Sequence, residues 1–155
     1  LDRYNCMNAY TELINWLVAL LNSDIDVNTV TEGSEIDRID ISKKSIYPLA
    51  HIDADDVTFN TNLYTFAVSV QVLDQVDYNN EIKTDKLYNN DNRVDVYNTS
   101  LQSLRRLFSE LKLNKRIVVD GEPSVQKVSD KKNNIIGWQM NLSIQVPNDI
   151  MSICQ

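Results

Sequence analysis

The chain has 155 residues, of which 43% are hydrophobic, and it carries a formal net charge of −7. This length and composition suit one folded domain and exclude global disorder. The acidic balance opposes the wrapping of nucleic acid, which needs a basic footprint, and the apolar stretches are too short to cross a bilayer. We therefore expect a single domain over residues 1–155, with no membrane partner.

A scarcity of glycine, cysteine and histidine removes most of the chemistry that a chain of this size could perform. The chain has three glycines, two cysteines and one histidine, all widely separated: Gly33, Gly121, Gly137, Cys6, Cys154 and His51. Scattered glycines provide no phosphate-binding loop, and the soft ligands are too far apart in sequence to indicate a structural zinc site. We expect no metal and no cofactor, and reduced cysteines are favoured over a disulfide bridge.

The N-terminal half predicts one helix followed by strands. Apolar residues recur every three or four positions from Tyr4 to Leu21, as in an amphipathic helix that ends at Asn22. Residues 24–60 are acidic and strand-prone, with one strand around 36–41 and another over Ser45–Ile52. Pro48 places the second of these strands at an edge or a bulge, because proline cannot donate to a ladder. The clearest strand, Tyr64–Val72, alternates between apolar residues and small polar ones.

The C-terminal half begins with a long polar segment, Gln75–Asn92, which is predicted to be a mobile, functional loop. An amphipathic helix follows, capped by Asp91 or Asn92. Its expected apolar stripe consists of Val94, Tyr97, Leu101, Leu104, Phe108 and Leu111. Strands are then expected over 116–119, 124–128 and 138–146.

This order of elements contains no repeated strand–helix–strand unit, so a parallel sheet is disfavoured. We predict an α+β fold in which two amphipathic helices pack on one face of a twisted, mainly antiparallel sheet. The residues expected to be buried together are Phe66, Val68, Val70, Leu104, Phe108, Met140, Leu142 and Ile144.

The best candidates for site chemistry are Asp53, Asp55 and Asp56, with His51 beside them. Alternate Asp residues resemble a calcium loop, but the glycine and the closing glutamate of such a loop are missing. A solvated acidic loop and a hydrogen-bonded structural histidine are the favoured interpretations. An enzyme limited to a carboxylate mechanism at these residues ranks last, and we expect no catalytic site.

Charge is distributed unevenly along the chain. Arg105, Arg106, Lys112, Lys115 and Arg116 cluster in one segment, whereas residues 24–56 hold nine acidic residues against three basic ones. A basic end and an acidic face can associate head to tail, and such a contact closes into a ring if the rotation allows. Charges spread over a solvated surface remain an equal alternative.

The order of elements, together with the segment Lys44–Ile52 (KSIYPLAHI) and the strand that runs into Val72-Leu73-Asp74, resembles the tail-terminator-like and neck ring proteins of tailed bacteriophages. The Asn-rich composition and the Tyr-Pro-Leu-Ala-His-Ile segment are most similar to those of virion proteins of Bacteroidetes phages, including the crAss-like group. The resemblance covers nearly the whole chain as an order of elements, without a diagnostic motif.

The resemblance implies a non-enzymatic virion protein of the neck or tail, assembled in the bacterial host cytoplasm. Its partners would be further copies of itself in a ring and other neck, tail or portal-proximal proteins, with DNA passing non-specifically through the channel. The alternative is a monomeric or dimeric adaptor domain without a catalytic role. Apolar groups in a polar loop and nearby arginines suit an interface, so the expected contact residues are Tyr78, Ile82, Leu87, Tyr88, Arg105, Arg106 and Arg116.

Overall fold

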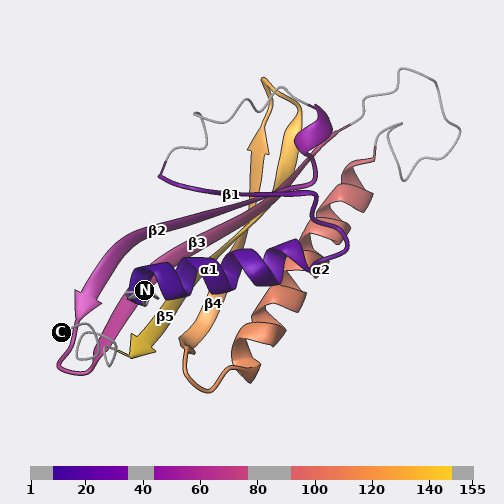
Figure 1. Ribbon diagram of the computed structural model, residues 1–155. Coiled ribbons are helices and arrows are strands. Elements are labelled where there is room, and N and C mark those ends of the chain that lie inside the picture. The colour runs from indigo at the N-terminus through magenta and orange to yellow at the C-terminus, as the bar shows by residue number, and fades with distance from the viewer. Residues whose placement is uncertain (1–8, 35–43, 77–91, 148–155) are drawn as a thin grey trace, which may run out of the picture.

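The computed structural model describes residues 9–34, 44–76 and 92–147 (Figure 1). In chain order the elements are α1 (Ala9–Asn22), β1 (Thr29–Glu32), a short 3-10 helix (Lys44–Ile46), β2 (Leu49–Phe59), β3 (Leu63–Gln75), α2 (Arg93–Leu113), β4 (Val118–Asp130) and β5 (Ile135–Pro147). The strands form one five-stranded sheet in the order β1-β2-β3-β5-β4. Only β1 and β2 pair in parallel, so the predicted α+β fold with a mainly antiparallel sheet is confirmed.

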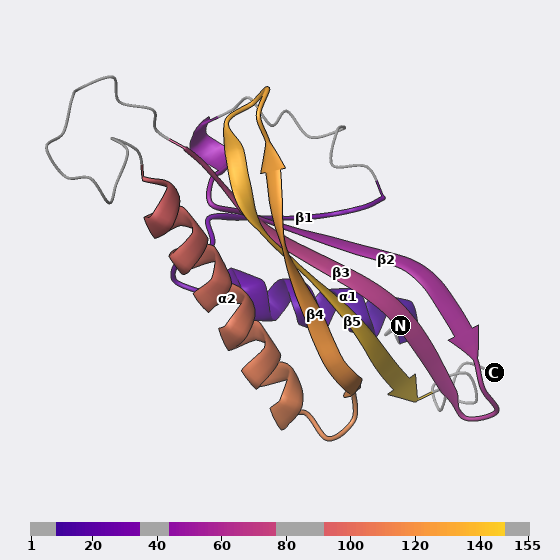
Figure 2. The same ribbon diagram turned by 180° about the vertical axis from the view of Figure 1, so that it is seen from behind.

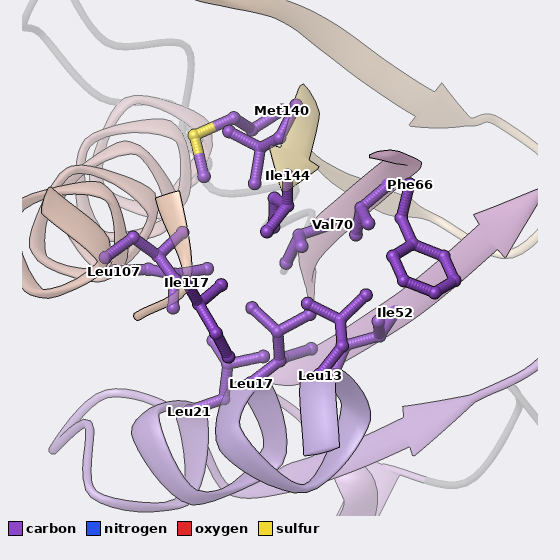
Figure 3. Close-up of a cluster of buried hydrophobic side chains, with 14 of the residues drawn as sticks. Leu13, Leu17, Leu21, Ile52, Phe66, Val70, Leu107, Ile117, Met140 and Ile144 are labelled. Atoms are coloured by element: carbon purple, nitrogen blue, oxygen red, sulfur yellow. The ribbon is translucent and has the colours of Figure 1, made fainter. Parts of the chain in front are cut away.

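Both helices cover the same face of this sheet. Figures 1 and 2 show α1 crossing that face, with α2 running obliquely beside β4. Leu13 and Leu17 of α1 point at Ile52 and Val70 of the sheet, and Leu107 of α2 joins the same cluster (Figure 3). The opposite face of the sheet carries no helix among the described elements.

The central strands follow the alternation read from the sequence. β3 and β5 pair in a continuous antiparallel register from Leu63–Pro147 to Gln75–Ile135. Seven of the eight residues of the predicted core belong to the main core cluster, and Phe108 is partly buried and packs against it. Period-two patterning located these strands because paired residues on one face are buried by the same helices.

The acidic residues 53–56 lie within β2 and not in the predicted loop. A bulge between Ala54 and Asp56 shifts the register of β2 against β3, so Asp55 is the extra residue. This shift interrupts the alternation in the sequence, and that interruption hid the strand. Solvation was predicted correctly for Asp55 and Asp56, which are both exposed.

Two other strand boundaries also differ from the expectation. Residues 44–46 form a 3-10 helix, and β2 starts only at Leu49, directly after Pro48. The two strands predicted at 116–119 and 124–128 are one strand, β4, whose register shifts between Asp120 and Ser124. Gly121 has a φ of 74° within this irregular stretch, a conformation that glycine adopts without steric cost.

Helix α2 has the predicted position but buries a different stripe. Val94 and Leu101 belong to the expected apolar stripe, yet they are 53% and 40% exposed. The buried positions are instead Val96, Ser100, Ser103, Leu104, Leu107 and Leu111. The helix is therefore rotated about its axis so that Ser100 and Ser103 face the core. Part of the predicted stripe faces outward along β4.

Several expectations fall on residues outside the described ranges. These are the helix start at 4–8, the strand around 36–41, both cysteines and most of the segment 75–92. Gln75 and Val76 at its start are described: Gln75 ends β3, and Val76 is buried against Val96 and Ile136. Asn92 occupies the N-cap position of α2, as expected, but its side chain makes no capping hydrogen bond.

Candidate functional site

Arg106 joins the two helices of the same chain through the loop that follows α1. Its guanidinium donates two hydrogen bonds of 2.8 Å to the carboxylate of Asp24 and also contacts Asp26. The Asp24 side chain is only 6% exposed. Burial is the largest single effect and favours the neutral form, but the hydrogen bonds and charge of Arg106, together with hydrogen bonds from the Asp26 backbone and Ser103, outweigh it and hold the pKa of Asp24 below its ordinary value of 3.8.

Arg116 also has an acidic partner within the chain, because its Nε donates to Oε1 of Glu12 at 2.6 Å. This contact joins the start of α1 to the loop before β4. Two of the three predicted interface arginines are therefore engaged in intramolecular ion pairs. Whether they also touch a neighbouring subunit stays a prediction.

Arg105 and Lys112 differ from these arginines. Both lie above the ring of Phe108, with the Arg105 Cζ at 5.7 Å and the Lys112 Nζ at 5.1 Å from its centroid. In the described part of the chain neither side chain forms a salt bridge. The free positive charge of α2 is consequently concentrated around one partly buried aromatic ring.

This ring lines a groove of about 330 Å³ between α2 and β4. The buried side chains of Leu104 and Met140 line it together with the more exposed ones of Leu101 and Val125. The groove exists because α2 is rotated, which leaves Leu101 at the surface beside the β4 edge.

His51 is a buried structural residue, as the sequence favoured. Its Nε2 lies 2.8 Å from the carbonyl oxygen of Gly33 and its Nδ1 lies 2.8 Å from the hydroxyl of Thr31. A carbonyl can only accept, so Nε2 carries a proton and donates it to Gly33, while Nδ1 shares a hydrogen bond with the Thr31 hydroxyl. Both ring nitrogens are occupied by the β1 side of the sheet.

The neighbouring carboxylates form an acidic surface at the same edge. Burial, followed by a hydrogen bond with Asp55 and the charge of Asp55, raises the pKa of Asp53. Glu32 at the end of β1 accepts a 2.6 Å hydrogen bond from the hydroxyl of Tyr10, which with burial raises the pKa of Tyr10 to about 12. In the described ranges no group of three or more potential ligands is arranged to hold a metal ion.

The helix-free face of the sheet was not singled out by the sequence. Gln71 and Gln139 are bonded through their amides at 2.8 Å, and Gln139 donates in turn to Asn141 at 2.9 Å. Ser69 and Ser143 continue this face on the same two strands. In the sequence, this face corresponds to the small and polar residues that alternate with the apolar residues of each strand. Such residues by themselves indicate only exposure to solvent.

The expected loop contacts Tyr78, Ile82, Leu87 and Tyr88 lie outside the described residues. Their role as interface residues therefore stays a prediction. Of the three predicted interface arginines, Arg105 lies over an aromatic ring, whereas Arg106 and Arg116 form ion pairs within the chain. Among the helices that are described, none combines the length and apolarity needed to cross a membrane.

No protein-family model matches this chain, and no curated protein matches it significantly. What the chain does is therefore inferred from its own residues and their geometry.

Proposed function

We propose that this chain is a non-enzymatic structural protein of the neck or tail of a tailed bacteriophage. Copies of it form a homomeric ring that joins or terminates the tail and leaves a channel for DNA. The proposal rests on the resemblance in the order of elements and on the chemistry of the helix-free face. Its neighbours are other neck, tail or portal-proximal proteins.

The helix-free face is the observation that carries the proposal. Its central strands present amides, hydroxyls and small side chains, such as Gln139, Asn141 and Ser143. The five described strands contain a single Lys or Arg, Lys127, and it lies on the helix side, above the rings of Tyr97 and Trp138. Strands that present no cation on this face do not retain phosphates, so the described part of the face suits a channel wall along which DNA moves.

Assembly is tested with the purified chain over a wide range of concentrations. Light scattering after size-exclusion chromatography is expected to show one closed oligomer, and negative-stain images are expected to show rings with a central opening. In virions, a labelled copy is expected at the neck or tail. A monomer or two-fold dimer at every concentration, with no label on the particles, would contradict the proposal and favour the adaptor alternative.

A charge substitution tests the channel wall separately. Gln139→Lys places a cation on the helix-free face, whereas Gln102→Lys places the same charge on an exposed position of α2. Only the first variant should make the rings retain duplex DNA at low salt, and added salt should release it. Equal retention by both variants would mean that the helix-free face does not line the channel.

A further inference from the structure

The groove between α2 and β4 has the composition of a docking surface. Leu101, Phe108, Pro123 and Val125 supply apolar walls, and the groove holds about 330 Å³. Leu101 and Val125 are 40% and 39% exposed, so this apolar area faces solvent in a single copy. Partly exposed apolar surface rimmed by charge is typical of sites that bind another protein.

The rim of the groove is mainly positive. Arg105 and Lys112 stand over the Phe108 ring, and Glu122 is the only carboxylate among the described lining residues. Because Arg106 and Arg116 are already paired with acidic residues of their own chain, Arg105 and Lys112 supply the positive charge that this groove offers to a partner. A negatively charged partner segment is therefore favoured.

A matching negative segment lies at the other edge of the sheet. β1 pairs with β2 only as far as Ile52, so the second half of β2 has no outer neighbour among the described strands. This half carries Asp53, Asp55 and Asp56, and none of them forms a salt bridge with a described cation. It ends at Phe59, an aromatic residue that is 74% exposed.

The two exposed acidic residues of this segment, Asp55 and Asp56, are adjacent in β2. They therefore concentrate two negative charges at the part of the strand that has no outer neighbour among the described strands.

We propose that the groove between α2 and β4 of one copy binds the second half of β2 of the next copy. Asp55 and Asp56 then lie against the positive rim formed by Arg105 and Lys112. The two surfaces are different and lie at opposite edges of the sheet, so the contact is head to tail and repeats around a ring. This inference rests on the proposed ring function and specifies which surfaces build the ring.

Reciprocal charge reversal tests the contact. The groove variant Arg105→Glu with Lys112→Glu, and the strand variant Asp55→Lys with Asp56→Lys, should each raise the protein concentration for half-assembly by at least about tenfold, because like charges then meet. A chain with all four substitutions should assemble again, as should a mixture of the two variants. Lys131→Glu with Lys132→Glu, in the β4–β5 turn, is the matched control and should assemble normally.

All of these positions lie on exposed side chains, and circular dichroism melts would verify that each variant folds. Two negative results are distinguishable. If the unsubstituted chain never oligomerises, the ring function itself fails and the contact fails with it. If the unsubstituted chain forms rings and the reversed variants form them equally well, or if the fourfold variant does not recover, the ring stands and this interface is wrong.

Discussion

The rotation of α2 predicts that two neighbouring residues of this helix differ sharply in their contribution to stability. Leu107 is 4% exposed and belongs to the main core, close to Ile117 (Figure 3). Phe108 is the larger residue but lies at the margin of that core, under Arg105 and Lys112. Side-chain size alone would give the opposite order from the one that the burial predicts.

Leu107→Ala removes a fully packed side chain and leaves a cavity, so it should lower the free energy of unfolding by about 2–5 kcal/mol. Phe108→Ala loses only the buried part of the ring and two exposed cation–π contacts, for a cost of about 1–2 kcal/mol. Alanine is also the better helix former, which offsets a few tenths of a kcal/mol in both variants.

Urea unfolding monitored by circular dichroism measures both values, and equal slopes would show that the two variants unfold in the same manner as the parent chain. At this chain length, 1 kcal/mol corresponds to about 2–4 °C in the melting temperature. A loss for Phe108→Ala as large as that for Leu107→Ala would refute the assigned orientation of α2. It would also remove the groove, since the ring would then be core.

Three further predictions concern the ion pair, the sheet and the acidic edge. Because the folded-state pKa of Asp24 lies below its unfolded value, its pair with Arg106 stabilises the fold above about pH 4 and loses this effect as the pH falls. Arg106→Gln should therefore lower the free energy of unfolding by about 1–3 kcal/mol at neutral pH. It should also flatten the acid limb of a stability–pH profile, and an unchanged limb would contradict the pairing. Gly137→Ala would place a Cβ 1.9 Å from a backbone oxygen of β3, so thermal unfolding should show a loss of about 3 kcal/mol or more in the free energy of unfolding. Gly121→Ala would place its Cβ in open space and should lower the same free energy by about 1 kcal/mol. Calcium and chelators should leave the melting temperature unchanged, and a calcium-dependent rise that Asp55→Ala abolishes would restore the carboxylate-site interpretation.

The sequence by itself determined the elements whose pattern is local and uninterrupted. β3 and β5 alternate residue by residue, and α1 repeats every three or four residues, so each places its apolar face without reference to the rest of the chain. The fold class follows from their order. A bulge at Asp55 was enough to defeat the same reasoning for β2, because one extra residue reverses which side chains face the core.

Only the tertiary structure decided how α2 is rotated and which charges are paired. Its sequence contains two overlapping apolar stripes, and contact with β5 selected the one that includes Ser100 and Leu107 and left Leu101 outside. Arg106 and Asp24 are 82 positions apart, so no local pattern could show that this arginine is engaged while Arg105, one residue earlier, is not. Periodicity predicts which residues of one segment share a face. The groove and its unpaired charges, in contrast, form between segments that meet only on folding.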